Sequence, residues 1–219
     1  MSSRIRLLAL IALACFAPAV FAQGYYSLPD SRPVRFYVMG GFNQPAGSAN
    51  DILQGGWDVG FGVAFRKPGS PLALRLEVNY ANNNATNALI NQGQQQTGLQ
   101  ITGGYADLYW GTANAEYQFP IVPGINGYVV GGAGAYYTQI SLTEFGYGYV
   151  CNPWWGYCYF GSGSAVVAQH DVTKFGWNAG LGVSFRLRGG TVLFVESRYN
   201  AVQMPQTFEF VPINIGVKF

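Results

Sequence analysis

Strict alternation of apolar and polar residues is the feature of this sequence that most constrains its fold. Between Trp177 and Leu187 every second residue is apolar, and the residues between them are Asn178, Gly180, Gly182, Ser184 and Arg186. Successive side chains of a β-strand point to opposite faces, so this pattern predicts a strand with one apolar and one polar face. An amphipathic helix would instead repeat about every 3.6 residues.

The same alternation recurs along the chain and predicts eight strands. They cover residues 35–42, 57–66, 72–80, 109–119, 128–137, 177–187, 192–202 and 211–219. The pattern is weaker in 35–42 and 128–137, because glycine blurs the two faces there. The sequence therefore predicts an all-β protein.

The segments between these strands alternate in length. Residues 67–71, 120–126 and 188–190 are short and rich in Gly and Pro, which favour tight turns. Residues 43–56, 81–106 and 142–175 are long, and the last link, 203–207, is short again. Short turns at one end and long loops at the other are typical of an outer-membrane barrel. We expect an eight-stranded antiparallel transmembrane β-barrel, an up-and-down meander with both termini on the short-turn, periplasmic side.

The positions of the aromatic residues indicate that the apolar faces point outwards. One set lies where strands meet the long loops: Trp57, Tyr80, Tyr109, Trp177 and Tyr199. A second set lies at the short-turn ends: Phe65, Phe119, Phe185 and Phe219. Two aromatic girdles with smaller apolar residues between them fit the two interfaces of a bilayer. The alternatives are a secreted sandwich or a lipocalin-like barrel, whose apolar faces would point inwards.

The N-terminus has the pattern of a secretory signal peptide. Arg4 and Arg6 precede an apolar run, and residues 20–22 suit a cleavage site, so we expect residues 1–22 to be removed. Residues 23–33 would form a periplasmic N-terminal segment, and residues 34–219 the barrel domain. The chain has 12 Lys and Arg against 10 Asp and Glu, so loss of the two arginines leaves no net charge and gives no reason to expect a nucleic-acid partner. After residue 22 no apolar run reaches the length of a membrane-spanning helix.

The signal peptide, the run GWNAGLGV at residues 176–183 and the terminal Phe219 together resemble the small outer-membrane barrels of the OmpA, OmpX and opacity-protein type. These motifs are specific for architecture and not for activity. The resemblance implies that Ile213, Ile215, Val217 and Phe219 form an assembly signal read by the β-barrel assembly machinery. It also implies contact with outer-membrane lipid and lipopolysaccharide, long extracellular loops and periplasmic termini.

Ten charged residues fall on the predicted inward faces: Arg35, Asp58, Arg66, Arg75, Glu77, Glu116, Arg186, Glu196, Arg198 and Lys218. The interior of an eight-stranded barrel is just wide enough to be filled by side chains, and buried charges there must pair. We expect a lumenal ion-pair network of Arg75, Glu77, Glu116, Glu196 and Arg198. The network would plug the barrel or, alternatively, gate a narrow pore, because inward glycines at 60, 62, 180 and 182 leave some room.

Cys151 and Cys158 are the cysteines that remain after the signal peptide, and an even count in an exported chain predicts a disulfide. The bond would close a small ring that contains Trp154, Trp155 and Tyr157. Rigid surface aromatics are typical binding anchors, so this ring is a candidate surface-binding loop. In the alternative, the flanking strands continue above the membrane as a hairpin with stacked aromatics.

Nothing in the sequence points to a catalytic or metal site. His170 is the single histidine, and the adjacent Asp171 would face the opposite way in a strand. One histidine and two oxidised cysteines are not a zinc ligand set, so we expect no metal and no cofactor. The loop at 81–105 is rich in Asn and Gln and is predicted to be mobile and solvated.

These observations predict a non-enzymatic outer-membrane protein that serves envelope structure, surface interaction or adhesion. An extracellular ligand is not identified by the sequence. The alternative function is a narrow, porin-like channel for ions or small apolar solutes, and a lipid-modifying enzyme is a third, weaker alternative.

Overall fold

The computed structural model describes residues 32–152, 156–187, 190–204 and 207–219. The predicted signal peptide at 1–22, most of the segment at 23–33, Trp154 and Trp155 lie outside the described residues.

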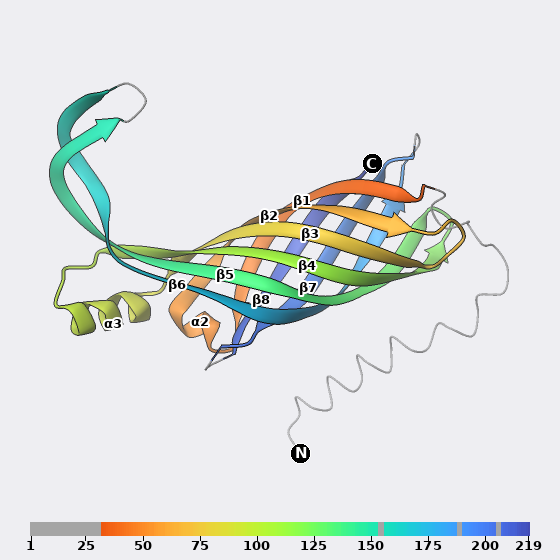
Figure 1. Ribbon diagram of the computed structural model, residues 1–219, viewed down its shortest axis with the longest axis horizontal. Coiled ribbons are helices and arrows are strands. Elements are labelled where there is room, and N and C mark those ends of the chain that lie inside the picture. Colours follow the sequence, from red (N-terminus) through yellow and green to blue (C-terminus); the bar gives the residue numbers. More distant parts are fainter. Residues whose placement is uncertain (1–31, 153–155, 188–189, 205–206) are drawn as a thin grey trace, which may run out of the picture.

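Eight strands form a closed barrel in sequence order, and every neighbouring pair is antiparallel (Figure 1). They are β1 (Val34–Ala46), β2 (Leu53–Arg66), β3 (Leu72–Ala85), β4 (Gly103–Val122), β5 (Ile125–Asn152), β6 (Tyr157–Arg186), β7 (Val192–Val202) and β8 (Phe208–Lys218). The barrel closes where β8 pairs with β1, for example Val217 opposite Val38. The predicted eight-stranded up-and-down meander is confirmed.

The period-two pattern of each strand places apolar side chains outside and polar ones inside. On β3, Leu74 and Leu76 are 50% and 44% exposed, whereas Arg75 and Glu77 are 0% and 4% exposed. Neighbouring strands repeat this division, with Phe61 exposed on β2. The barrel therefore presents an apolar outer wall around a polar interior, which is the arrangement expected for a lipid-facing barrel.

Aromatic side chains form a girdle near the long-loop end. The rings of Trp57, Tyr80, Tyr109 and Tyr137 follow one another across four strands, with centroid separations of 5.2, 4.9 and 6.0 Å. Trp177 and Tyr199 form a further pair at 5.7 Å. At the other end Phe65, Phe119, Phe185 and Phe219 are all at least 38% exposed.

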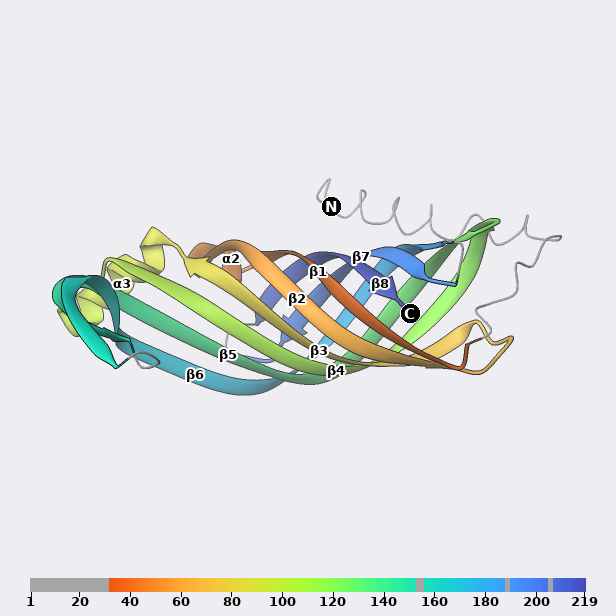
Figure 2. The same cartoon turned by 90° about the horizontal axis from the view of Figure 1, so that it is seen from above.

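Tight turns connect the strands at one end of the barrel. Residues 67–71 link β2 to β3, and β4 turns into β5 between Val122 and Ile125. Gly124 has φ +84° in this turn, a conformation that suits glycine. The turn is shorter than the predicted 120–126, because both strands continue into that segment. The C-terminus lies at this end, opposite the long connections (Figures 1 and 2).

The connection between β3 and β4 is solvated as predicted, because most of its residues are exposed, but it is not a loop throughout. It contains the helix α3 (Asn87–Thr97), and β3 and β4 both extend beyond their predicted ends. The side chain of Thr86 accepts a hydrogen bond from the Leu89 amide as an N-cap, and Gly98 ends the helix with φ +70°. Gly93 packs closely against Leu142 and Ile101, which holds the helix to the strand end. A short helix, α2 (Ala49–Ile52), lies in the connection between β1 and β2.

The predicted loop at 142–175 is instead a long hairpin of β5 and β6 that projects past the barrel (Figure 1). The last pair between β4 and β5 is Gly103 with Thr143, so residues 144–152 pair with β6 alone. At about 3.3 Å per residue this segment extends on the order of 30 Å. This outcome matches the hairpin alternative. None of the helices in the described residues is long and apolar enough to cross a membrane.

Candidate functional site

The structure brings all five residues of the expected lumenal network together. Arg75 and Glu77 come from β3, Glu116 from β4, and Glu196 and Arg198 from β7. Each pair on one strand is two residues apart, so both side chains point inwards. All five are buried, with exposures between 0% and 5%.

Arg75 lies at the centre of this network and contacts three carboxylates. Its Nη1 is 3.0 Å from Glu116 Oε2 and 2.6 Å from Glu196 Oε2, and its Nε is 2.7 Å from Glu77 Oε1. Arg198 binds Glu77 through both terminal nitrogens, at 2.5 and 2.8 Å, and its Nε contacts Glu196. Two guanidinium groups and three carboxylates are thus interlinked across the lumen.

Two further cations complete the network at Glu116, although sequence reasoning left them outside it. Arg66 Nη2 lies 2.6 Å from Glu116 Oε1, and Lys218 Nζ lies 2.9 Å from Glu116 Oε2. The alternation of inward and outward residues along each strand had already predicted that both side chains lie inside the barrel. That both contact Glu116 depends on the stagger between strands around the closed ring, which the alternation along a single strand does not reveal.

Aromatic rings surround these charges and were missed in the sequence. Tyr37 Oη donates a hydrogen bond of 2.5 Å to Glu77 and accepts one of 3.0 Å from Arg75 Nε. The Arg75 guanidinium lies 4.7 Å from the centre of the Tyr37 ring, and Lys218 Nζ lies 5.0 Å from that of Tyr128. Both tyrosines occupy inward positions in the alternation of their strands, and this pattern could have predicted that their rings lie in the lumen.

The inward glycines do not leave a free passage in the described barrel, contrary to the expectation that they provide room. A Cβ built on Gly62 would lie 2.3 Å from Cζ of Tyr37, and one on Gly182 would lie 2.4 Å from Cζ of Tyr128. The absence of side chains at Gly62 and Gly182 therefore leaves the space into which the two tyrosine rings pack. The lumen is filled at this level.

An apolar plug fills the lumen nearer the long-loop end. Trp110, Tyr136 and Phe210 pack together there, with ring centroids 5.2 to 6.3 Å apart. Leu53 and Phe208 belong to the same buried cluster. The inward charges are evident from the alternation of the sequence, whereas this apolar plug is not predicted by it.

Asp58 is a buried inward carboxylate that stands apart from the ion pairs. It is 2% exposed, and neither of its oxygens accepts a hydrogen bond of standard geometry from the described residues. Both side-chain polar atoms of Asn79 and Oδ1 of Asn214 are likewise without a hydrogen bond. These groups form a polar zone around Asp58 that is poorly satisfied by the protein itself.

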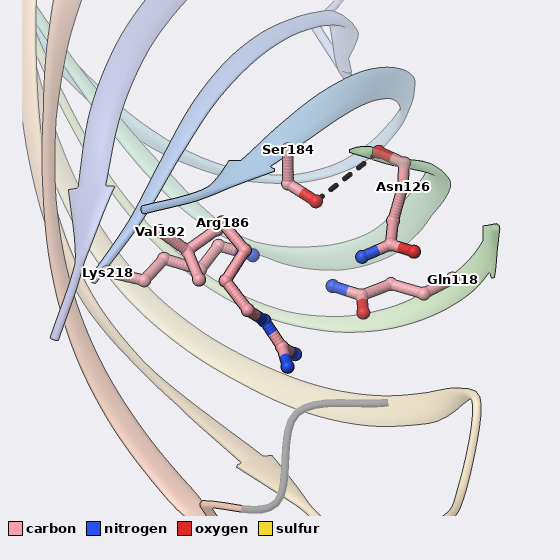
Figure 3. A pocket seen from close by; sticks show the side chains of 6 residues that line it. All are labelled: Gln118, Asn126, Ser184, Arg186, Val192 and Lys218. Atoms are coloured by element: carbon pink, nitrogen blue, oxygen red, sulfur yellow. Dashed lines mark hydrogen bonds between the residues drawn. The ribbon is translucent and has the colours of Figure 1, made fainter. Parts of the chain in front are cut away.

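The lumen opens at the short-turn end into a small cavity of about 20 Å³ (Figure 3). Side chains from five strands line it: Gln118, Asn126, Ser184, Arg186, Val192 and Lys218. The Ser184 hydroxyl donates a hydrogen bond of 3.3 Å to the Asn126 carbonyl oxygen. Arg186 and Lys218 make this mouth cationic.

The disulfide and the surface aromatics lie on the projecting hairpin. Cys151 is bonded to Cys158, and the two residues are also paired across the strands. Tyr157 is 54% exposed beside this bond. Phe145, Tyr147 and Phe160 are 52%, 77% and 67% exposed, and sequence reasoning had not selected them as binding residues.

The outward face of β8 carries the residues expected to form the assembly signal. Ile213, Ile215 and Phe219 are 50%, 65% and 54% exposed, and Val217 is half-buried. The four side chains therefore form a continuous apolar stripe on the outer wall.

The structure does not bring His170 and Asp171 together as a pair. His170 lies on β6 opposite Ile140, and Asp171 is opposite Gln139, so the two side chains leave opposite faces. Among the described residues no group of three His, Cys, Asp or Glu side chains is suited to hold a metal ion.

Comparison with solved structures finds the same fold in small outer-membrane barrels. A major outer membrane protein from Thermus thermophilus is 10% identical over 86% of this chain and 99% of its own, with a TM-score of 0.54. The Neisserial surface protein A is 16% identical over 85% of this chain and 96% of its own, with a TM-score of 0.51. No family model and no curated protein matches the chain. At these identities the similarity concerns the fold.

Proposed function

We propose that this chain is a non-enzymatic outer-membrane β-barrel with a closed lumen, which anchors a projecting hairpin for surface interaction. The observation that carries the proposal is the filling of the lumen at two levels. The ion pairs around Arg75 occupy one level, and the cluster around Trp110 occupies the other. A barrel filled in this way serves as an anchor and not as a wide pore.

The outer wall supports the membrane location. Large apolar side chains on all eight strands are exposed, and aromatic girdles lie near both ends. Two solved barrels of the same fold are described as a surface protein and an outer membrane protein. We assign outer-membrane lipid, lipopolysaccharide and the β-barrel assembly machinery as partners, with Ile213, Ile215, Val217 and Phe219 as the assembly signal.

The hairpin supports the surface role. Its outer part carries exposed Phe145, Tyr147 and Phe160, and its strands are tied together by the disulfide. Exposed aromatics held on a cross-linked ribbon lose little conformational entropy on binding, as is typical of interface anchors. We place the hairpin outside the cell and both termini in the periplasm, and we include Trp154, Trp155 and Tyr157 in the binding surface.

A narrow channel is the second candidate, and the unsatisfied polar zone around Asp58 favours it. Buried polar atoms without hydrogen-bond partners in the protein attract water. Water between the ion pairs around Arg75 and the cluster around Trp110 would reduce the length of lumen that an ion must cross without hydration.

Planar-bilayer conductance of the refolded protein separates these functions. We expect no discrete current steps under conditions in which a general porin conducts. Reproducible small steps would contradict the closed anchor and establish the channel.

The sidedness is tested by adding chymotrypsin to intact cells, because chymotrypsin cleaves after aromatic residues. We expect cleavage within the hairpin and protection of the rest of the barrel. A hairpin that is cleaved only after the outer membrane is permeabilised would contradict the proposed orientation.

A further inference from the structure

The short-turn mouth of the barrel gathers positive charge. Arg186 and Lys218 point into this mouth (Figure 3). Arg66 is buried at the same end of the barrel, and Lys67 lies on the adjoining turn. Among the described residues, the acidic side chains of the connections and strand ends lie instead at the long-loop end: Asp51, Asp107, Glu144, Asp171 and Glu209. This division gives the short-turn mouth a positive potential that favours anions.

Glu116 is the carboxylate that faces these cations, and its hydrogen-bonding capacity is already used. It accepts from Arg66 at 2.6 Å, Arg75 at 3.0 Å and Lys218 at 2.9 Å. The amide Nε2 of Gln118 donates to it at 2.8 Å. A carboxylate offers about four lone-pair sites, so these four donors saturate it. One negative charge is thus shared among three cations.

Arg186 does not form an ion pair with Glu116. Within the described part of the chain, no carboxylate lies within ion-pair distance of its guanidinium. Arg35 lies at the same mouth, where its Nη1 donates a hydrogen bond of 2.8 Å to the Gly190 carbonyl oxygen. An anion beside Arg186 would supply the counter-charge that Glu116 does not provide to it.

The cavity beside Arg186 supplies the other donors that an anion needs. Arg186 presents a planar fork of N–H groups, and Lys218 presents an ammonium from the same side of the mouth (Figure 3). The side-chain amides of Asn126 and Gln118 line the same space. Its volume of about 20 Å³ is sufficient for one oxygen atom, and the open side leaves room for the rest of a ligand.

We propose that this mouth is a binding site for a phosphate group, either free phosphate or a terminal phosphate of a small molecule. A guanidinium fork next to an ammonium is suited to phosphate oxygens. Arg186 and Lys218 both bring positive charge to the cavity, so a phosphate dianion is preferred to a monoanionic carboxylate. The site is independent of the hairpin and of the closed lumen.

The test is a titration of the folded full-length barrel in lipid nanodiscs, followed by backbone amide NMR at constant ionic strength. We expect inorganic phosphate to cause saturable shifts at Asn126, Ser184 and Arg186. Equal shifts with sn-glycerol 3-phosphate identify a terminal phosphate as an accepted ligand, and their absence restricts the site to free phosphate. Acetate that binds as well as phosphate, or phosphate shifts that do not saturate, would overturn the proposal.

Matched variants separate a defined site from general attraction of anions. Arg186→Gln is expected to weaken phosphate binding at least about tenfold, since a charged hydrogen-bond donor is lost. Lys67→Gln removes a cation from the same end but outside the cavity, and we expect less than about a twofold change. Asn126→Asp, which adds a carboxylate to the mouth, should also abolish binding and serves if Arg186→Gln does not fold. Equal losses in Lys67→Gln and Arg186→Gln would overturn the site.

Discussion

At the scale of single residues, the stability of the lumen depends on which charges share partners. Glu116 compensates three buried cations, whereas Asp58 is equally buried and accepts no hydrogen bond of standard geometry in the described structure. Breaking a buried ion pair is costly because the remaining charge is left without compensation. Two carboxylates of similar burial therefore differ in the effect that their removal should have.

Glu116→Gln should lower the free energy of unfolding by about 3–5 kcal/mol, because Arg66, Arg75 and Lys218 lose their shared counter-charge. Asp58→Asn is the matched control and should change it by less than about 1 kcal/mol. Urea unfolding of the barrel in lipid vesicles measures both values. Losses of the same size would show that the two carboxylates are equivalent and that the network is misread.

The inward glycines allow a second test at this scale. Gly62→Ala should cost about 1–3 kcal/mol, because the new Cβ would lie 2.3 Å from Cζ of Tyr37 and displace a ring bound to Glu77 and Arg75. Gly111 lies on the outer face, and a Cβ there comes no closer than 3.8 Å to the Glu77 carbonyl oxygen. Gly111→Ala should therefore be neutral in the same unfolding measurement. A neutral Gly62→Ala would mean that the lumen has more room than the tyrosines leave.

At the scale of elements, the barrel and the hairpin differ in what stabilises them. Each barrel strand has two paired neighbours, but residues 144–152 of β5 pair with β6 alone. An isolated two-stranded ribbon is marginally stable in water. The disulfide between Cys151 and Cys158 therefore contributes to the order of the hairpin and little to that of the barrel.

Cys151→Ser should leave the barrel folded and loosen the hairpin, because a cross-link of this kind contributes on the order of 2–3 kcal/mol locally. Limited chymotrypsin digestion of the refolded protein should cleave the hairpin faster, and wild-type protein treated with reductant should behave in the same way. Loss of barrel assembly in this variant would show that the hairpin is needed for folding.

At the scale of the whole molecule, closure distinguishes this fold from an open sheet. The pairing of β8 with β1 closes the ring, so the barrel's strands hydrogen-bond to one another and present no open sheet edge along the paired region. Opening the ring would expose unpaired backbone groups to lipid, so the barrel should resist detergent until it is heated.

Unboiled protein should therefore migrate differently from boiled protein on a denaturing gel. The comparison needs only the refolded chain, with a general porin as the positive control. Identical mobility before and after boiling would contradict a closed barrel.

The sequence by itself determined the strands and their faces. Period-two alternation is a local property, so each side chain could be assigned inside or outside from its neighbours, as Arg75, Glu77 and Leu76 illustrate. The number of strands and the alternation of short and long connections then predicted a closed eight-stranded barrel. The cysteine pair was likewise readable from its count and its small spacing.

Only the tertiary structure decided which inward residues meet and where the strands end. Lys218 reaches Glu116 because closure places the end of β8 next to β1 with a particular stagger, and that stagger is a property of the whole ring. Tyr37 and Tyr128 fill the space above Gly62 and Gly182 for the same reason. The helix α3 and the extended hairpin depend on contacts between distant segments, such as Gly93 with Leu142, which no local pattern encodes.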